Sequence, residues 1–436
     1  MAPGDASRPG RDVFRAPKGT RDVLAPESDE WIEIVATFAE RAARFGYGLV
    51  VTPIFEHYEV YARVGESTDV VSKEMYDFLD KGGRRLALRP EGTAGVVRAY
   101  VEHRPASPWK AWYVAPNFRY ERPQAGRYRQ HWQLGAEAIG SDDPRVDVEM
   151  IDLLAGLYRA LGIADARLLL NSMGDADTRE RYSAVLLDYW RAHADVLGAE
   201  LERAEQNPLR ILDSKHPDWQ EMIGRAPQLG EHLSDASAAQ FEQVQAGLRD
   251  VGIAFEIEPR LVRGFDYYTA TVFEFQSDAI GGAQNALGGG GRYDRLSEEM
   301  GGPAAPAIGF GTGIERILLA RAGSGVDAAR LFTGGLDAFV IDAVDTGDAT
   351  ALLHELREFG LRADRSYGSG GASRSMKKQW GAADKSGARY AVMLAPRELA
   401  EGHVVVKDLA SGEQIEVRRD DAPAWLRMHT EEKTER

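Results

Sequence analysis

Arginine residues cluster around one short turn of the chain, in the segment FRYERPQAGRYRQHWQLGAE that covers residues 118–137. Arg119, Arg122, Arg127 and Arg129 all fall here, although the chain as a whole carries a net charge of -15. The planar guanidinium group binds phosphate oxygens in a forked geometry that the ammonium group of lysine lacks. Polar strand faces usually meet only water, but so dense a group of arginines favours a phosphate-binding surface.

The residues on either side of this turn alternate between apolar and polar types, as expected for a half-buried hairpin over 111–140. The apolar face consists of Trp112, Val114, Phe118, Trp132, Leu134 and Ala136, and the polar face of Asn117, Arg119, Glu121, Gln133, Gly135 and Glu137. Gly135 weakens the strand without a gain in packing. It therefore predicts that another group approaches the backbone closely at this point.

The other common phosphate and hydrolase motifs are absent from the sequence. No Gly-Lys pair exists, so there is no Walker loop, and the glycines of IGFGTG lack the surroundings of a dinucleotide fingerprint. Neither HExxH nor GxSxG occurs, and the absence of cysteine excludes disulfides and thiolate zinc sites. The remaining interpretation of the arginine cluster is that it binds a nucleotide on an antiparallel sheet.

Length and charge limit the other possibilities. The 436 residues suggest two or three domains, and the acidic balance argues against general coating of nucleic acid, because phosphate binding relies on local Lys and Arg. No apolar run approaches the roughly 20 residues of a membrane span. A soluble protein is expected, with no membrane partner, and the lack of cysteine fits a cytoplasmic location.

The pattern of elements predicts two folded domains. We expect a disordered tail over 1–15, a first domain over 16–325 with a helical insertion over 175–255, a linker over 326–336, an α/β domain over 337–425 and a charged tail over 426–436. Residues 27–45 carry the apolar stripe of a helix, and 49–54 indicate an edge strand because they contain Pro53. Alternating strands and helices after residue 337 predict a mostly parallel sheet.

Several motifs together resemble the signatures of a known enzyme class. The hairpin FRYERPQAGRYRQHWQLG resembles motif 2 of class II aminoacyl-tRNA synthetases, GYGLVVTPIFE resembles motif 1, and IGFGTGIERILL resembles motif 3. APKGTRD, LRPEGT, LVRGFDYYTATVFEF and GGGGRYD resemble signatures of the histidyl-tRNA synthetase family, and SMKKQWGAADKSGARYAVML resembles its anticodon-binding domain. These segments follow the family's order and cover nearly the whole chain.

The resemblance implies an α+β catalytic domain, built on an antiparallel sheet flanked by helices and carrying a helical insertion. A small α/β anticodon-binding domain follows. The implied reaction activates L-histidine with ATP to histidyl-adenylate and transfers histidine to the 3′ end of tRNA(His), giving AMP and diphosphate. The attacking carboxylate is already ionised, so the first step needs positive charge rather than a general base. Mg²⁺ is expected with ATP, but the sequence does not reveal its ligands.

By the same resemblance, arginines should bind ATP. Arg119 in the hairpin and Arg263 in LVRGFD match the two arginines at the α-phosphate and are the implied catalytic residues. Arg316 in GIERIL should reach the terminal phosphate, and Arg127 should contact ATP from the loop.

The resemblance also implies the histidine site. Glu91 and Thr93 of RPEGT match the binders of the amino group, assisted by Gln133. An imidazole needs partners for both ring nitrogens, and Glu137 and Tyr268 match these positions, with Tyr293 as a neighbour.

Contacts with tRNA are implied at two places. The matching residues are Gln124 and Arg129 on the hairpin loop, and Arg374, Lys377 and Lys378 in the last domain. Residues 361–390 hold seven Lys or Arg and two Asp, a local charge of +5, with Trp380 nearby for stacking or packing. Unpaired bases are read by stacking and edge contacts within basic surroundings. A solvated helix face is the competing explanation for any single lysine.

Two other functions use the same type of fold. A regulatory subunit of ATP phosphoribosyltransferase resembles the catalytic core and binds histidine without activating it, but that family lacks the last domain and degrades the ATP motifs. A sensor of uncharged tRNA is the other alternative, and no kinase signature accompanies it here. A homodimer is expected from motif 1.

Overall fold

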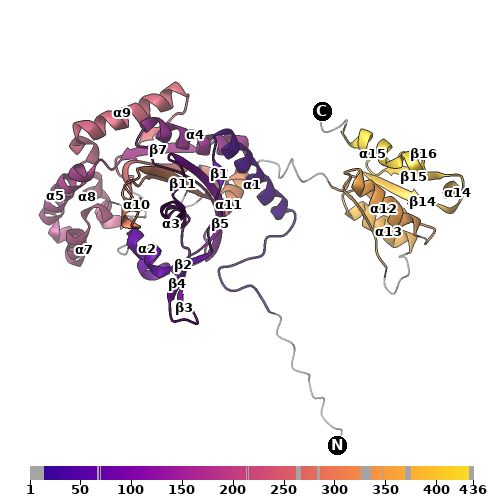
Figure 1. Ribbon diagram of the computed structural model, residues 1–436, viewed down its shortest axis with the longest axis horizontal. Helices are drawn as coiled ribbons and strands as arrows, with labels where there is room; N and C mark the ends of the chain where they lie inside the picture. Colours follow the sequence, from indigo (N-terminus) through magenta and orange to yellow (C-terminus); the bar gives the residue numbers. More distant parts are fainter. Residues whose placement is uncertain are drawn as a thin grey trace, which may run out of the picture. The chain divides into compact units, whose positions relative to one another are not determined.

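The computed structural model describes residues 14–65, 68, 70–212, 214, 216–261, 267–281, 285–325, 335–345, 347–368 and 375–431. The chain forms two compact units, Met1–Ala328 and Ala329–Arg436, both drawn in Figure 1. Arg263, Arg374, most of the 326–336 linker and most of the 1–15 tail lie outside the described residues.

The first unit is built on an eight-stranded sheet with the order β1-β5-β6-β11-β10-β9-β7-β8. Its strands are β1 (Gly48–Leu49), β5 (Trp109–Phe118), β6 (Gln130–Ile139), β7 (Arg167–Ser172), β8 (Glu256–Ile257), β9 (Thr269–Gln276), β10 (Ala286–Arg292) and β11 (Ala307–Gly313). All neighbours from β5 to β7 are antiparallel, and β1 and β8 join the two edges in parallel. The expected antiparallel sheet is confirmed.

Helices cover both faces of this sheet (Figure 1). On one face, α1 (Glu27–Arg44), α4 (Pro144–Ala160) and α11 (Ile314–Gly323) enclose a core that includes Trp112 and Leu134 of the hairpin. On the other, α3 (Thr93–His103) and α10 (Leu296–Glu299) pack with Tyr113 and Tyr293. The alternation in the sequence therefore separates the two faces as predicted.

The segment before the hairpin forms a small second sheet with the order β2-β4-β3. Its elements are β2 (Phe55–His57), α2 (Tyr58–Gly65), the π-helical turn η1 (Val70–Glu74), β3 (Asp77–Leu79) and β4 (Arg85–Leu88). The prediction of a continuous strand over 49–54 is wrong: β1 ends at Leu49, the last bond to β5 is from the N–H of Val50 to the carbonyl of Trp112, and the next strand starts only at Phe55. Pro53 lies in this gap, and proline has no N–H to donate to a neighbouring strand.

The helical insertion contains α5 (Ala176–Ala192), α6 (Ala194–Leu197), α7 (Leu201–Gln206), α8 (Gln220–Gly224) and α9 (Asp235–Asp250), with 3-10 turns η2 (Gly198–Glu200), η3 (Pro208–Ile211), η4 (Pro217–Trp219) and η5 (Leu229–His232). Helices α5 to α8 surround a separate core that includes Tyr182, Leu186 and Trp190. Helix α9 instead packs Val244 and Leu248 into the core of the main sheet. The insertion is thus attached to the sheet through α9.

The second unit has a five-stranded sheet with the order β13-β12-β14-β15-β16. Its elements are β12 (Ala338–Asp342), α12 (Asp348–Glu358), β13 (Ala363–Arg365), α13 (Met376–Lys385), β14 (Tyr390–Leu394), α14 (Pro396–Ala400), β15 (His403–Asp408), β16 (Gln414–Arg418) and α15 (Ala422–Glu431). The first three strands are parallel and the last two antiparallel, which confirms a small α/β domain. Helix α15 continues past residue 425, and Leu426 is buried in its core. None of the described helices is long and apolar enough to cross a membrane.

Candidate active site

A cavity of about 770 Å³ opens on the polar face of the eight-stranded sheet. Strands β5, β6, β9, β10 and β11, the start of α3 and the insertion contribute to its wall. Seven residues expected to bind ligands line it together: Glu91, Thr93, Arg119, Arg127, Gln133, Tyr268 and Arg316. They are far apart in sequence, so the order of the strands is what brings them into one wall.

Three guanidinium groups converge in this cavity. Arg119 follows β5, and its Nε donates to the carbonyl of Pro90 at 2.8 Å. Arg316 lies in the first turn of α11 and donates to the carbonyl of Ala286. Arg127 comes from the hairpin loop and pairs with Glu121 at 3.1 Å. Burial and the neighbouring charge of Arg127 lower the pKa of Arg316, so an anion entering here would offset a like-charge repulsion.

Glu91 is held at the start of α3, beside these arginines. Its carboxylate accepts from the backbone N–H groups of Thr93 at 2.6 Å and Ala94 at 2.8 Å, which have no helical partners of their own. Burial raises the pKa of Glu91 despite these two donors. The carboxyl group of Glu91 is therefore held in place to bind a cationic group in the cavity.

Glu137 lies one layer behind the wall and is fully buried. It accepts from the hydroxyls of Thr93 at 2.8 Å, Tyr293 at 2.5 Å and Tyr113 at 3.4 Å. Burial raises the pKa of Glu137 to about 8. Glu137 and Tyr293 thus adjoin the cavity through a cluster of hydroxyl groups rather than lining it.

The glycines of IGFGTG make room for side chains of the neighbouring strand β6. A Cβ atom on Gly309 would lie 1.5 Å from Oε2 of Glu137, and one on Gly311 would lie 1.9 Å from Nε2 of Gln133. Gln133 also accepts from Asn117 at 2.6 Å, which orients its amide. The spaced glycines therefore serve side-chain packing at the site.

Gly135 is explained by Tyr113, a residue that the reasoning from sequence missed. A Cβ atom on Gly135 would lie 2.2 Å from Cζ of Tyr113, and one on Gly92 would lie 2.4 Å from the same ring. The close approach predicted from Gly135 is thus made by the protein itself. The alternation of the strand places Tyr113 on the polar face, the same face as Gly135, so the sequence could have indicated this contact.

His131 is a second residue whose place in the wall the sequence did not indicate. Burial, and then the charge of Arg119, lower its pKa to about 3. The imidazole of His131 is therefore neutral at physiological pH.

Gln124 and Arg129, the two hairpin residues expected to contact tRNA, lie outside the cavity wall. Gln124 and Arg127 form an isolated bridge that closes the turn. Arg129 donates to the carbonyl of Glu121 at 3.2 Å, and its guanidinium carbon lies 3.7 Å from the ring centroid of Tyr120. Arg129 thus braces the loop in this structure.

In the second unit, Lys377 and Lys378 are exposed in the first turn of α13. Trp380 is half-buried, and the Nζ atom of Lys407 lies 5.1 Å from its ring centroid. Trp380 therefore packs within the domain rather than standing free. Among the described residues, no group of three or more His, Cys, Asp or Glu could hold a metal ion.

An antiparallel sheet that carries an arginine-rich hairpin and two cavity arginines from separate motifs is the architecture of class II aminoacyl-tRNA synthetases. Residues 19–317 match the family model described as histidyl-tRNA synthetase, and residues 339–429 match an anticodon binding domain. The chain belongs to the histidyl-tRNA synthetase family, whose members are ligases.

Individual relatives agree with this assignment. A histidine–tRNA ligase from Streptomyces coelicolor is 47% identical over 96% of this chain and 99% of its own length. The apo histidyl-tRNA synthetase of S. aureus is 35% identical, with a TM-score of 0.80 over 95% of this chain and 100% of that one. A Bacillus halodurans structure, titled as an ATP phosphoribosyltransferase regulatory subunit/histidyl-tRNA synthetase, has a TM-score of 0.62 at 22% identity, covering 87% of this chain and 98% of that one. That last likeness shows the fold alone.

Proposed function

We propose that this chain joins histidine to tRNA(His) in two steps, both in the cavity of the first unit. The histidine carboxylate attacks the α-phosphorus of ATP, forming an O–P bond and releasing diphosphate. A hydroxyl of the terminal ribose of tRNA(His) then attacks the carbonyl carbon of the adenylate, and AMP leaves. The observation that carries the proposal is one cavity whose wall holds the guanidinium groups of Arg119 and Arg316 and the acid Glu91, with Glu137 behind the wall and hydrogen-bonded to Thr93.

The arginines supply the charge that the first step requires. Arg119 and Arg263 bind the α-phosphate, where negative charge grows in the transition state, and Arg316 binds the terminal phosphate. Arg127 contacts the nucleotide from the loop. The fixed contacts of Arg119 with Pro90 and of Arg316 with Ala286 support these roles, because preorganised donors need no rearrangement during the reaction.

Mg²⁺ bound with ATP would neutralise phosphate charge. It usually takes one or two protein carboxylates in addition to phosphates and water. Glu274, in the cavity wall and close enough to Arg316 to influence its pKa, fits this requirement.

Histidine is selected by polar groups that another amino acid would leave unpaired. Its ammonium group is bound by Glu91, Thr93 and Gln133, and its imidazole by Glu137 and Tyr268. Tyr293 and Tyr113 support Glu137 from behind through their hydroxyls. This polar pocket would discriminate strongly without an editing site.

The tRNA and a second copy of the chain are the proposed macromolecular partners. Gln124 and Arg129 face the acceptor end, while Arg374, Lys377 and Lys378 bind the anticodon region. Leu49, 57% exposed, and Val51, 84% exposed, lie on and beside the edge strand β1 and suit burial against a second copy. We propose that this homodimer acts in the cytoplasm.

Exchange of diphosphate with ATP, measured with each amino acid in turn, tests the enzymatic proposal. Histidine alone should support exchange, and Arg263→Ala should abolish it while histidine still binds. A regulatory protein would bind histidine without any exchange in the wild type. Unchanged exchange in Arg263→Ala would refute the role of that arginine.

A further inference from the structure

Strand β9 begins with an irregular step next to the cavity. Gly291 of β10 pairs with Val272, but the next residue, Arg292, pairs with Thr269, so Ala270 and Thr271 are extra residues on β9. We call these two residues the bulge. Ala270 has a φ of 34°, a backbone conformation that residues with a Cβ atom rarely adopt. Such a conformation persists only where its surroundings hold it in place.

The bulge is held on one side by the backbone of the neighbouring segment. The N–H of Ala270 donates to the carbonyl of Gly174 at 3.0 Å, and the N–H of Met173 donates to the carbonyl of Ala270 at 2.6 Å. Arg179 also donates to the carbonyl of Tyr268 at 3.0 Å. These bonds fix the bulge from the side of β7 and α5.

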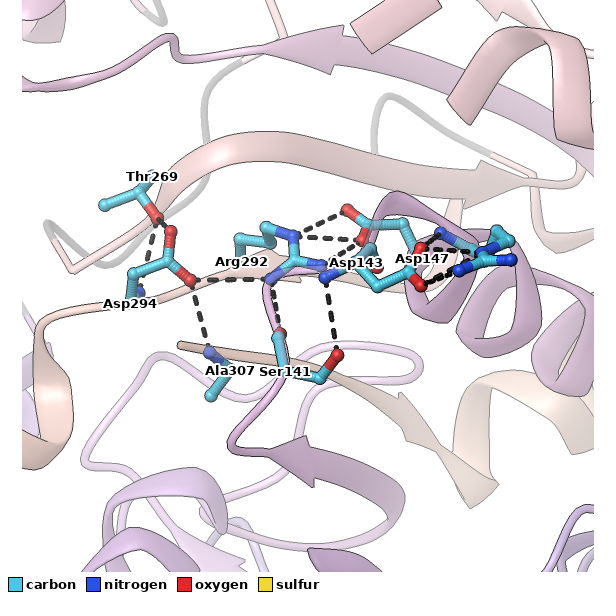
Figure 2. A network of polar contacts seen from close by, with 8 residues as sticks. Ser141, Asp143, Asp147, Thr269, Arg292, Asp294 and Ala307 are labelled. Atoms are coloured by element: carbon cyan, nitrogen blue, oxygen red, sulfur yellow. Dashed lines mark hydrogen bonds and ion pairs between the residues drawn. The ribbon is translucent and has the colours of Figure 1, made fainter. Parts of the chain in front are cut away.

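On the other side, Asp294 holds the residue that precedes the bulge. Its Oδ2 accepts from the hydroxyl of Thr269 at 3.0 Å, and its Oδ1 accepts from the N–H of Ala307 at 3.2 Å (Figure 2). The N–H of Asp294 also donates to the same hydroxyl at 3.3 Å. Thr269 and Asp294 are therefore joined by two hydrogen bonds.

Asp294 is in turn oriented by a buried ion pair. Arg292 and Asp147 are both fully buried, and their closest contact, from Nη2 to Oδ2, is 2.5 Å. The other guanidinium N–H groups of Arg292 point to the carbonyls of Ser141 at 2.9 Å and Asp143 at 3.0 Å, and Nη1 lies 3.6 Å from Asp294 (Figure 2). Arginine fills all these positions because it offers five donors in a rigid plane.

Tyr268 lies close to the bulge and in the wall of the cavity. A bulge bends its strand and changes the direction of nearby side chains, and Tyr268, two residues before Ala270, lines the cavity. Its ring passes over Gly291, where a Cβ atom would lie 2.9 Å from Cδ1 of Tyr268 and 2.5 Å from the carbonyl oxygen of Thr271. The ring of Tyr268 thus packs directly against the backbone of β10 beside the bulge.

We propose that Thr269 and Asp294, anchored by the Arg292–Asp147 pair, are positioning residues that lock the bulge and aim Tyr268 at the imidazole of bound histidine. The inference rests on the proposed function, because it assigns Tyr268 to histidine. None of these four residues lines the cavity. The network therefore acts on affinity for histidine and leaves the phosphate-binding arginines unaffected.

Thr269→Val and Thr269→Ser separate positioning from simple packing. Valine keeps the shape of threonine and loses the hydroxyl, whereas serine keeps the hydroxyl and loses a methyl group. We expect Thr269→Val to weaken histidine binding about tenfold, measured by calorimetry without ATP, and Thr269→Ser to stay within about twofold of the wild type. In diphosphate exchange, the KM for histidine should rise in Thr269→Val while the KM for ATP does not change.

Ser277→Ala is the matched control. Ser277 directly follows the end of β9 that is farther from the bulge, and its hydroxyl donates a similar hydrogen bond to Asp165 at 2.9 Å. This variant should lower the melting temperature without changing histidine affinity. Ala270→Gly provides a variant that accepts the φ of the bulge without strain, so it should keep the bulge in place and leave histidine affinity within about twofold of the wild type.

The inference would be overturned if Thr269→Val bound histidine as tightly as the wild type, or if Thr269→Ser bound it more weakly than Thr269→Val. It would also be overturned if Ser277→Ala lost as much histidine affinity as Thr269→Val. A loss of about tenfold in histidine affinity in Ala270→Gly would do so as well, because glycine relieves the strain and keeps the backbone bonds of the bulge. Failure of the wild type to bind histidine would instead count against the proposed function, so the two failures can be told apart.

Discussion

Replacing Glu137 with glutamine should change how the stability of the first unit depends on pH. Burial raises the pKa of Glu137 to about 8 from its usual 4.5. Between these two values the folded state keeps a proton that the unfolded state has lost. The free energy of unfolding contributed by this group is therefore complete below pH 4.5 and falls as the pH rises towards 8.

The size of this effect follows from the pKa difference. At about 1.4 kcal/mol per pKa unit, the free energy of unfolding should fall by on the order of 4 kcal/mol across this range. The hydroxyls of Thr93, Tyr293 and Tyr113 already moderate the shift, because each stabilises the charged form. Glutamine has no proton to lose here, so Glu137→Gln should show a flatter pH profile.

Urea unfolding followed by tryptophan fluorescence, at fixed protein concentration and several values between pH 5 and 8.5, measures the difference. Glu298→Gln is the matched control, since Glu298 is exposed on α10 and its replacement should leave the wild-type profile unchanged. Parallel profiles for the wild type and Glu137→Gln would refute the reasoning. They would mean that Glu137 is ionised in the folded protein throughout this range.

Three other changes should have separable effects. Gly135→Ala should destabilise the first unit by about 1–3 kcal/mol in thermal unfolding, because the new Cβ atom meets the ring of Tyr113, and a second change of Tyr113 to alanine should recover part of the loss. No loss in Gly135→Ala would contradict this packing. Arg316→Ala should reduce diphosphate exchange by about 100-fold with unchanged histidine affinity, and weakened histidine binding would contradict its assignment to ATP. Lys377→Glu with Lys378→Glu should raise the KM for tRNA and reduce its salt dependence while leaving exchange intact; an unchanged KM would exclude these lysines from the tRNA surface.

The local patterns of the sequence predict much of the fold. The hairpin is an example, because the alternation of apolar and polar residues depends only on a period of two, and Trp112 and Leu134 lie in the core as that period requires. Segment 49–54 is the opposite case. Most of this segment, which contains Pro53, instead lies between two short strands, β1 and β2, that pair with different partners, β5 and β4.

The residue types of the candidate site could be predicted from the sequence, but the contacts between its residues could not. Arginines around a turn predict phosphate binding, and the structure places Arg119, Arg127 and Arg316 in one cavity. The reason for Gly135 could not be read from its spacing, because the ring that approaches it belongs to Tyr113 on the paired strand. Such distances depend on which strands are neighbours.

The sequence by itself determined the two faces of the hairpin and the class of the two domains. It also determined which residue types are available to bind an anion and a cationic group. Only the tertiary structure decided that Tyr268 before β9 lines the cavity while Glu137 of β6 and Tyr293 after β10 meet directly behind its wall. The physical reason is the strand order β6-β11-β10-β9, which is set by packing on both faces of the whole sheet. The same packing holds Ala270 at a φ that its own side chain disfavours, and no local pattern encodes that choice.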